Sequence, residues 1–190
     1  MDNIENKIIA QIKEDLNNYC NNKTIRNEKN WSKILLLFKD FSFYEICKIF
    51  IQIYNEELND NYKKENSYEY KEYIRNIIES YLEKKKEIDI EKIRIEIKNI
   101  FKNIFSSCDY SNQIILEIIG YLLFIFIENK YYNIEDLKDA IINNEALQNK
   151  IIKIIKYIIL SSGNKKEKYY EDFKTLYKDN DIYLMNLSPE

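Results

Sequence analysis

The side chains that could do chemistry in this chain are carboxylates, tyrosines and three cysteines, because the sequence contains no histidine. Histidine is the commonest general base, the usual partner of a catalytic serine or cysteine, and a ligand in most zinc sites. The two glycines are isolated, so no glycine-rich phosphate-binding loop exists. Aspartates and glutamates are plentiful, but they alternate with lysines in the pattern of ordinary solvent-facing helix surfaces. We therefore predict that the protein is not an enzyme and holds no metal or cofactor.

The three cysteines, Cys20, Cys47 and Cys108, are far apart and odd in number. Their spacing matches neither a metal site nor a disulfide framework, so buried thiols in a reducing compartment are the simplest interpretation. The first residues also lack the basic and then apolar pattern of a signal peptide. These features predict a cytoplasmic location.

The composition favours long helices in a single domain. The chain has 190 residues, of which 45% are hydrophobic, with only 2 glycines and 1 proline. Tight turns of sheet proteins consume glycine and proline, whereas this length and apolar content suit one well-filled core. No internal linker interrupts the pattern, so we predict one domain over residues 1–180 and a loose tail over residues 181–190. The net charge of −3 disfavours general nucleic-acid binding, and we interpret the basic clusters at 84–86 and 165–166 as solvated faces.

Apolar residues recur at helical spacing along most of the chain and predict an all-α protein. Ser42 followed by Glu45 is a capping-box pattern, Asp89 and Asn133 are expected helix caps, and Gly163 stands where a left-handed cap would end a helix. Residues 17–29 and 59–66 are polar and predict links. The predicted helices span residues 3–16, 31–38, 42–54, 67–81, 90–105, 114–127, 134–141, 145–161 and 165–177.

Two of these segments are apolar on nearly every side. Residues 31–38 predict a short, well-covered helix. Residues 114–127 are the most apolar stretch, but they contain Glu117 and fall short of the roughly 20 residues that a membrane span needs. They therefore predict the central core helix. Gly120 lies in the middle of this helix, at a cost of about 1 kcal/mol relative to alanine, and its small size would admit a close neighbouring helix.

The order and lengths of these helices, most clearly over residues 70–160, resemble an MA-three domain. This HEAT-like helical module occurs in translation initiation factor 4 gamma, programmed cell death protein 4 and some splicing factors. The start of the segment at 133–137 is similar to a short helix of the family, and residues 163–166 resemble the turn that follows its next helix. The resemblance implies an all-α fold of about nine helices, arranged as a HEAT-like stack of antiparallel helical hairpins in an α-α superhelix.

The resemblance also implies a binding site in the loop before the long helix. Domains of the family dock onto a DEAD-box RNA helicase, subunit 4A of the initiation complex, through acidic residues there. The family pattern is an acid, three residues, a second acid, one residue and a proline, and these three positions hold Ser106, Tyr110 and Asn112. Asp109 is adjacent and could supply the acid. The candidate partner-binding residues are thus Asp109, Tyr110 and Asn112, with stabilisation of a helix N-terminus as the alternative role of Asp109.

By this resemblance the chain is a monomeric, cytoplasmic scaffold of translation initiation that binds the helicase and has no membrane or sequence-specific nucleic-acid contact. Three alternatives remain open. The chain could be a related helical-repeat scaffold of splicing or ribosome assembly that does not bind this helicase. It could be an unrelated helical bundle. It could also be an enzyme, which would need a deep pocket lined by two or more carboxylates.

Overall fold

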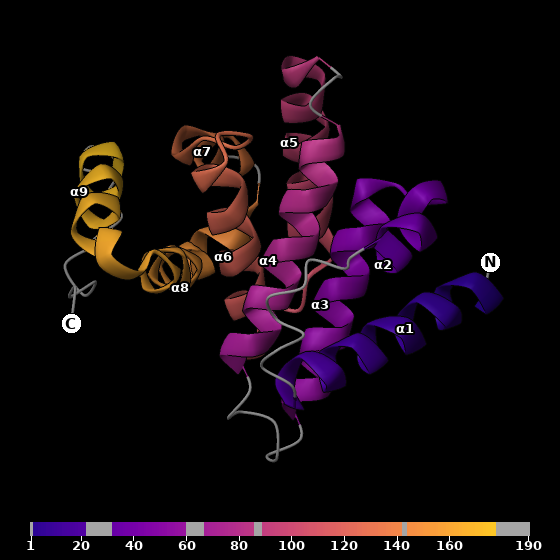
Figure 1. Cartoon of the computed structure of the whole chain (residues 1–190). Coiled ribbons are helices and arrows are strands. Elements are labelled where there is room, and N and C mark those ends of the chain that lie inside the picture. The colour runs from indigo at the N-terminus through magenta and orange to yellow at the C-terminus, as the bar shows by residue number, and fades with distance from the viewer. Residues whose placement is uncertain (1, 22–31, 60–66, 86–88, 142–143, 178–190) are drawn as a thin grey trace. The chain divides into compact units, whose positions relative to one another are not determined.

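The computed structural model describes residues 2–21, 32–59, 67–85, 89–141 and 144–177 (Figure 1). These residues form nine α-helices and two short 3-10 segments, and they contain no strand. The prediction of an all-α fold with about nine helices is therefore confirmed for this part of the chain. The helices are α1 (Asp2–Asn21), α2 (Ser32–Leu37), α3 (Phe43–Asn59), α4 (Ser67–Lys84), α5 (Ile90–Ser107), α6 (Gln113–Glu128), α7 (Ile134–Ile141), α8 (Glu145–Ser161) and α9 (Lys166–Tyr177).

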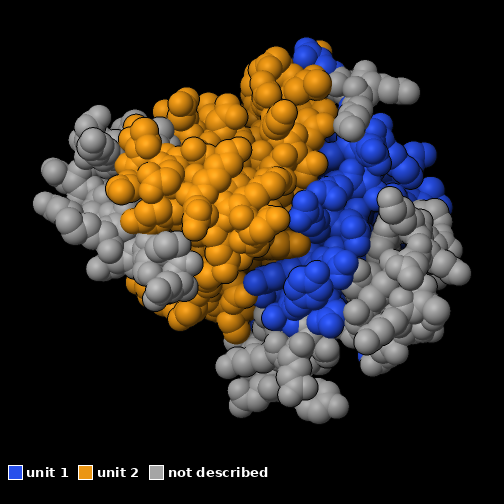
Figure 2. Space-filling model, turned by 60° about the vertical axis from the view of Figure 1, so that its left-hand side comes forward, with its two compact units in different colours: residues 1–89 blue, residues 90–190 orange. Residues whose placement is uncertain are grey.

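The helices divide into two compact units, coloured separately in Figure 2. Unit 1 covers residues 1–89 and contains α1 to α4, and unit 2 covers residues 90–190 and contains α5 to α9. The single domain over residues 1–180 stays a prediction.

Unit 1 is built around α1, which packs against α2, α3 and α4. A polar link joins two of these helices, because the Tyr73 hydroxyl on α4 donates to the Asp15 carboxylate on α1 at 3.0 Å. Burial and the neighbouring carboxylate raise the pKa of Tyr73 well above its usual value. The predicted capping box begins α3: the Ser42 amide donates to the Glu45 carboxylate at 2.7 Å, and the Glu45 amide donates to the Ser42 hydroxyl at 3.2 Å.

Two predictions for unit 1 are wrong in part. Helix α1 continues to Asn21, so residues 17–21 are helical rather than part of a link. Each asparagine disfavours a helix by well under 1 kcal/mol, and the packing of the whole helix outweighs this small cost. Leu36 on α2 is 71% exposed, although residues 31–38 were predicted to be covered. A helix of six residues buries one face only, here with Ile34 and Leu35. Trp31 lies outside the described residues.

In unit 2, each of α5 and α6 packs against the second helix after it in the chain. Helix α6 packs against α8 and α5 packs against α7, while α8 also contacts α7 and α9. Gly120 of α6 lies against Tyr157 of α8, and Glu128 at the end of α6 pairs with Lys165 just after α8. The contacts advance in the same direction along both helices, so α6 and α8 run parallel. The first helices of successive hairpins have this relation in a helical-repeat stack, as the predicted fold class requires.

The crossing of α6 and α8 depends on Gly120. A Cβ atom placed on this residue would lie 2.6 Å from the Tyr157 Cβ and 3.1 Å from the Ile154 carbonyl oxygen. Neither atom belongs to the free end of a flexible side chain, so the two backbones approach at a distance that a larger residue would prevent. The predicted role of Gly120 in admitting a close helix is confirmed.

Helix α6 is the central core helix of unit 2, as predicted. Every residue from Ile118 to Phe126 is buried. Its end forms a Schellman motif, in which the Tyr131 amide donates to the Phe126 carbonyl at 2.8 Å and the Lys130 amide donates to the Ile127 carbonyl at 3.0 Å. None of the described helices is both long enough and apolar enough to cross a membrane.

Both left-handed residues of the described chain lie after helices of unit 2. Lys130 has a φ of 65° at the position of the Schellman motif that glycine usually occupies. Gly163 has a φ of 57° after α8, which confirms its predicted left-handed conformation.

Candidate functional site

The candidate site is the loop between α5 and α6, residues 108–112, and Tyr110 anchors it. The Tyr110 hydroxyl donates to the Phe105 carbonyl near the end of α5 at 2.5 Å. The Asn144 side-chain amide, at the start of α8, reaches the same hydroxyl and the same carbonyl at 3.4 Å. Burial raises the pKa of the half-buried Tyr110 phenol, so it stays protonated and keeps donating. Tyr110 thus fastens the loop to the two helices through its hydroxyl.

Asn112 is the N-cap of α6. Its side-chain oxygen accepts hydrogen bonds from the amides of Ile114 at 3.0 Å and Ile115 at 3.3 Å. These two amides belong to the first turn, where no helix carbonyl is available to them. Asparagine is among the best residues for this position, which gives a local reason for Asn112 where the family pattern has proline.

Asp109 is the one candidate residue whose side chain is exposed. Its carboxylate accepts a hydrogen bond from the Ser111 hydroxyl at 2.6 Å and another from the Ser111 amide at 3.0 Å. These bonds lower the pKa of Asp109, so the carboxylate is ionised at neutral pH. Because Asn112 caps α6, Asp109 is left as a fixed negative charge on the loop surface. Sequence reasoning identified this residue but missed Ser111, which orients it.

Two of the three cysteines, Cys47 and Cys108, have described side chains. Cys47 is a buried thiol and Cys108 is a half-buried one. Burial raises the pKa of Cys108, which disfavours the thiolate that a nucleophile or metal ligand needs. The side chain of Cys20 lies outside the described residues. No group of three metal-ligating side chains occurs in the part of the chain that the structure describes.

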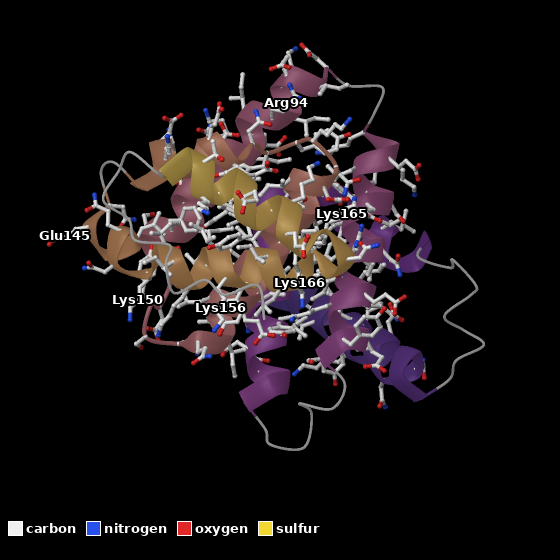
Figure 3. All side chains as sticks on the ribbon, turned by 90° about the vertical axis from the view of Figure 1, so that its left-hand side faces the viewer. Arg94, Glu145, Lys150, Lys156, Lys165 and Lys166 are labelled. Atoms are coloured by element: carbon white, nitrogen blue, oxygen red, sulfur yellow. The ribbon has the colours of Figure 1, made fainter. Side chains whose placement is uncertain are left out.

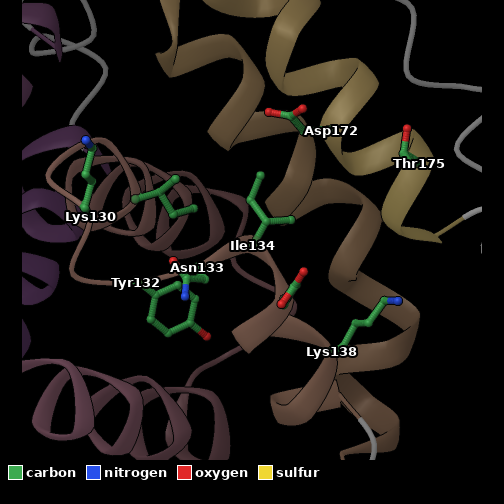
Figure 4. Close-up of a pocket in the computed structure, with 9 residues that line it drawn as sticks. Lys130, Tyr132, Asn133, Ile134, Lys138, Asp172 and Thr175 are labelled. Atoms are coloured by element: carbon green, nitrogen blue, oxygen red, sulfur yellow. The ribbon is translucent and has the colours of Figure 1, made fainter. Parts of the chain in front are cut away.

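Unit 2 also contains an open groove of about 720 Å³, lined by the end of α6, by α7 and by α9 (Figure 4). Charges of both signs line it: Lys130 follows α6, Glu135 and Lys138 belong to α7, and Asp172 belongs to α9. Figure 4 shows Lys130, Lys138 and Asp172 at different sides of the groove. This is an open surface of mixed charge rather than a deep pocket in which carboxylates converge.

A second groove, of about 500 Å³, lies in unit 1 between α1 and α3. Three of its lining residues, Glu5, Asp40 and Glu45, are acidic. Hydrogen bonds from the amide and hydroxyl of Ser42 lower the pKa of Glu45. A carboxylic acid that donates a proton in catalysis needs the opposite shift. The role of Glu45 is therefore to cap α3.

No family model, no curated protein and no solved structure matches this chain. Nothing in these comparisons identifies an MA-three domain, so that resemblance stays an expectation from the pattern of helices.

Proposed function

We propose that the chain is a non-catalytic protein-interaction module that docks a basic surface of its partner at the α5–α6 loop. The observation that carries this proposal is the exposed Asp109 carboxylate on a loop that Tyr110 and Asn112 hold in place. A loop ordered before binding loses little conformational freedom on association. A carboxylate accepts charge-assisted hydrogen bonds from arginine, which are about twice as strong as neutral ones.

The partner we propose is a DEAD-box RNA helicase similar to subunit 4A of the translation initiation complex, with the module acting as a cytoplasmic scaffold. The helical stack of unit 2 and the acidic loop before its long helix support this choice. Ser106, at the place of the first acid of the family pattern, is exposed and donates its hydroxyl to the Asn103 carbonyl. One loop carboxylate, rather than two, would then carry the contact. Exposed charge pairs of this kind mainly set the rate of encounter and the choice of partner.

The test is surface plasmon resonance of the full chain on immobilised helicase subunit 4A. Asp109→Lys places a like charge against a basic partner and should weaken binding at least tenfold, mainly through a slower association rate. Asp109→Asn removes the charge but keeps an oxygen for the Ser111 bonds, so it should show a smaller loss with the loop intact. Glu171→Lys, on the exposed face of α9, is the matched control and should stay within twofold of the wild type.

Two outcomes would reject the proposal. If the unmodified chain does not bind the helicase at tens of micromolar, the partner is wrong. If Asp109→Lys and Glu171→Lys lose the same amount, the effect comes from net charge and the α5–α6 loop is not the site.

A further inference from the structure

After its first residue, Glu145, helix α8 carries only positive charges. From residue 146 to residue 166 the chain contains five lysines and no acid. The exposed face of α5, in contrast, mixes Glu91 and Glu96 with Lys92, Arg94 and Lys98. A mixed face is close to neutral at a distance, whereas a face with one sign of charge attracts the opposite sign.

Three lysines of α8 form a lysine row: Lys150, Lys153 and Lys156. Lys153 and Lys156 are exposed and Lys150 is half-exposed. None of the three forms an ion pair with a described residue, whereas Lys98 on α5 bridges Asp136 and Asp139. The row therefore holds three ammonium groups that the rest of the described chain does not neutralise.

The geometry of the row suits a linear polyanion. Each step of three residues along a helix rises about 4.5 Å and moves the side chain about 60° around the helix axis. The two steps from Lys150 to Lys156 therefore make a row about 9 Å long that covers one broad face of the helix. Figure 3 shows Lys150 and Lys156 following one another along the same side of α8, with Lys166 beyond them at the start of α9. Glu145 lies at the opposite end of α8 from Lys166 in that view.

We propose that the lysine row binds the phosphodiester backbone of nucleic acid without sequence preference. Lysine ammonium groups neutralise phosphates, and such contacts position a nucleic acid without reading its bases. Asn149 is exposed on the same face and can donate a hydrogen bond to a phosphate oxygen. This function is additional to the docking at the α5–α6 loop and does not depend on it.

The composition of the face favours nucleic acid over a protein or a membrane. Protein interfaces have aromatic, methionine and arginine residues at their centre and few lysines. A helix that binds a membrane surface needs a free apolar face, but most of the large apolar residues of α8 are buried. Leu160, at 44% exposure, is the one large apolar residue among the exposed residues of α8.

The net charge of −3 does not oppose this inference, because salt screens charges beyond about 8–10 Å. A phosphate at the lysine row interacts mainly with nearby charges. Glu145 precedes the acid-free segment and Glu167 follows it. A row of three lysines predicts weak binding, with a Kd on the order of tens of micromolar at low salt.

The test measures fluorescence anisotropy of labelled 20-nucleotide uridine RNA with the full chain at several salt concentrations. Three phosphate contacts predict a slope of log K against log salt near −2, which corresponds to an about 20-fold weaker Kd at 200 mM than at 50 mM salt. The same measurement with a single-stranded DNA and with an RNA duplex of the same length shows which kind of nucleic acid supplies the phosphodiester backbone. Similar binding of both single strands would show that the 2′-hydroxyl is not read, as the proposal expects.

The decisive variant combines Lys150→Gln, Lys153→Gln and Lys156→Gln and should weaken RNA binding at least tenfold and flatten the salt slope. The matched control combines Lys7→Gln, Lys92→Gln and Lys102→Gln, three exposed lysines on α1 and α5. This control removes the same charge, and its affinity for RNA should stay within twofold of that of the wild type. Circular dichroism checks that both variants keep their helix content.

The proposal is overturned if no nucleic acid binds at 50 mM salt with 100 µM protein, or if the two triple variants lose equal affinity. It is also overturned if a polyglutamate peptide or phosphatidylserine vesicles bind the row more tightly than RNA does. None of these outcomes bears on the helicase measurement, so the two proposals fail separately.

Discussion

Helices α2 and α6 have similar apolar sequences but different surroundings. The stretch from Ile34 to Phe38 in unit 1 is continuously apolar, as is the stretch from Ile118 to Phe126 in unit 2 apart from its glycine. All of the second stretch is buried, whereas the first contains Leu36 at 71% exposure. An apolar helix needs neighbours on every side to be buried completely. Apolar composition therefore predicts a helix in both places, but burial follows from what packs around it.

The largest change in stability that tests this comparison is expected from a cavity made in the core around α6. Leu122 is fully buried, so Leu122→Ala should lower the free energy of unfolding by about 3–5 kcal/mol. Urea denaturation of the full chain, followed by circular dichroism, measures this loss. A change below 1 kcal/mol would mean that the core around α6 is loosely packed.

A smaller loss is expected at the crossing of α6 and α8. Gly120→Ala improves helix propensity by about 1 kcal/mol, but its Cβ would push against the Tyr157 Cβ at 2.6 Å and force the helices apart. Overpacking costs about 1–3 kcal/mol, so we expect a net destabilisation of about 1 kcal/mol. Gly120→Val should lose more stability than Gly120→Ala. A stabilised alanine variant would contradict the close approach.

A modest gain is expected where α6 ends. Lys130 has a φ of 65°, a conformation that costs a residue with a Cβ about 1–2 kcal/mol. Glycine avoids this cost but gains freedom in the unfolded chain, so Lys130→Gly should stabilise the protein by about 0.5–1 kcal/mol in thermal denaturation. Lys130→Ala keeps the Cβ and should show no gain. Equal gains in both variants would assign the effect to the lost charge.

The smallest effect is expected at the exposed side of α2. Leu36→Ala removes the same atoms as Leu122→Ala, but from a side chain that is 71% exposed. The free energy of unfolding should change by no more than about 0.5 kcal/mol, measured in the same urea titrations. A loss comparable to that of Leu122→Ala would show that α2 is covered in solution and would remove the contrast between the two helices.

Local patterns predicted most of the helices. The span of α8 matches its prediction at both ends, and the capping box at Ser42 and Glu45 forms as expected. These features depend on residues within one or two turns of each other, which the sequence displays directly. The prediction missed the last turn of α1. Its asparagines were interpreted as part of a link, but asparagine also occurs in helices that pack well.

The candidate loop was predicted less completely. Its position between two helices and the exposed charge of Asp109 agree with the sequence analysis. The anchoring of Tyr110 was missed, because one partner, the Phe105 carbonyl, is a backbone atom that no sequence pattern marks, and the other, Asn144, lies 34 residues away in the chain. The capping role of Asn112 had a local signal, an asparagine directly before an apolar helix, which the comparison with the family pattern obscured.

The sequence by itself determined that this chain is helical, where most of its helices start, and which stripe of each helix is apolar. These properties follow from periodicity, propensity and caps, which act over a few residues. The tertiary structure alone decided that Leu36 faces solvent, that α6 and α8 meet at Gly120, and that Tyr110 ties the loop to α8. Such facts depend on distances between residues far apart in the chain, and those distances exist only once the helices pack.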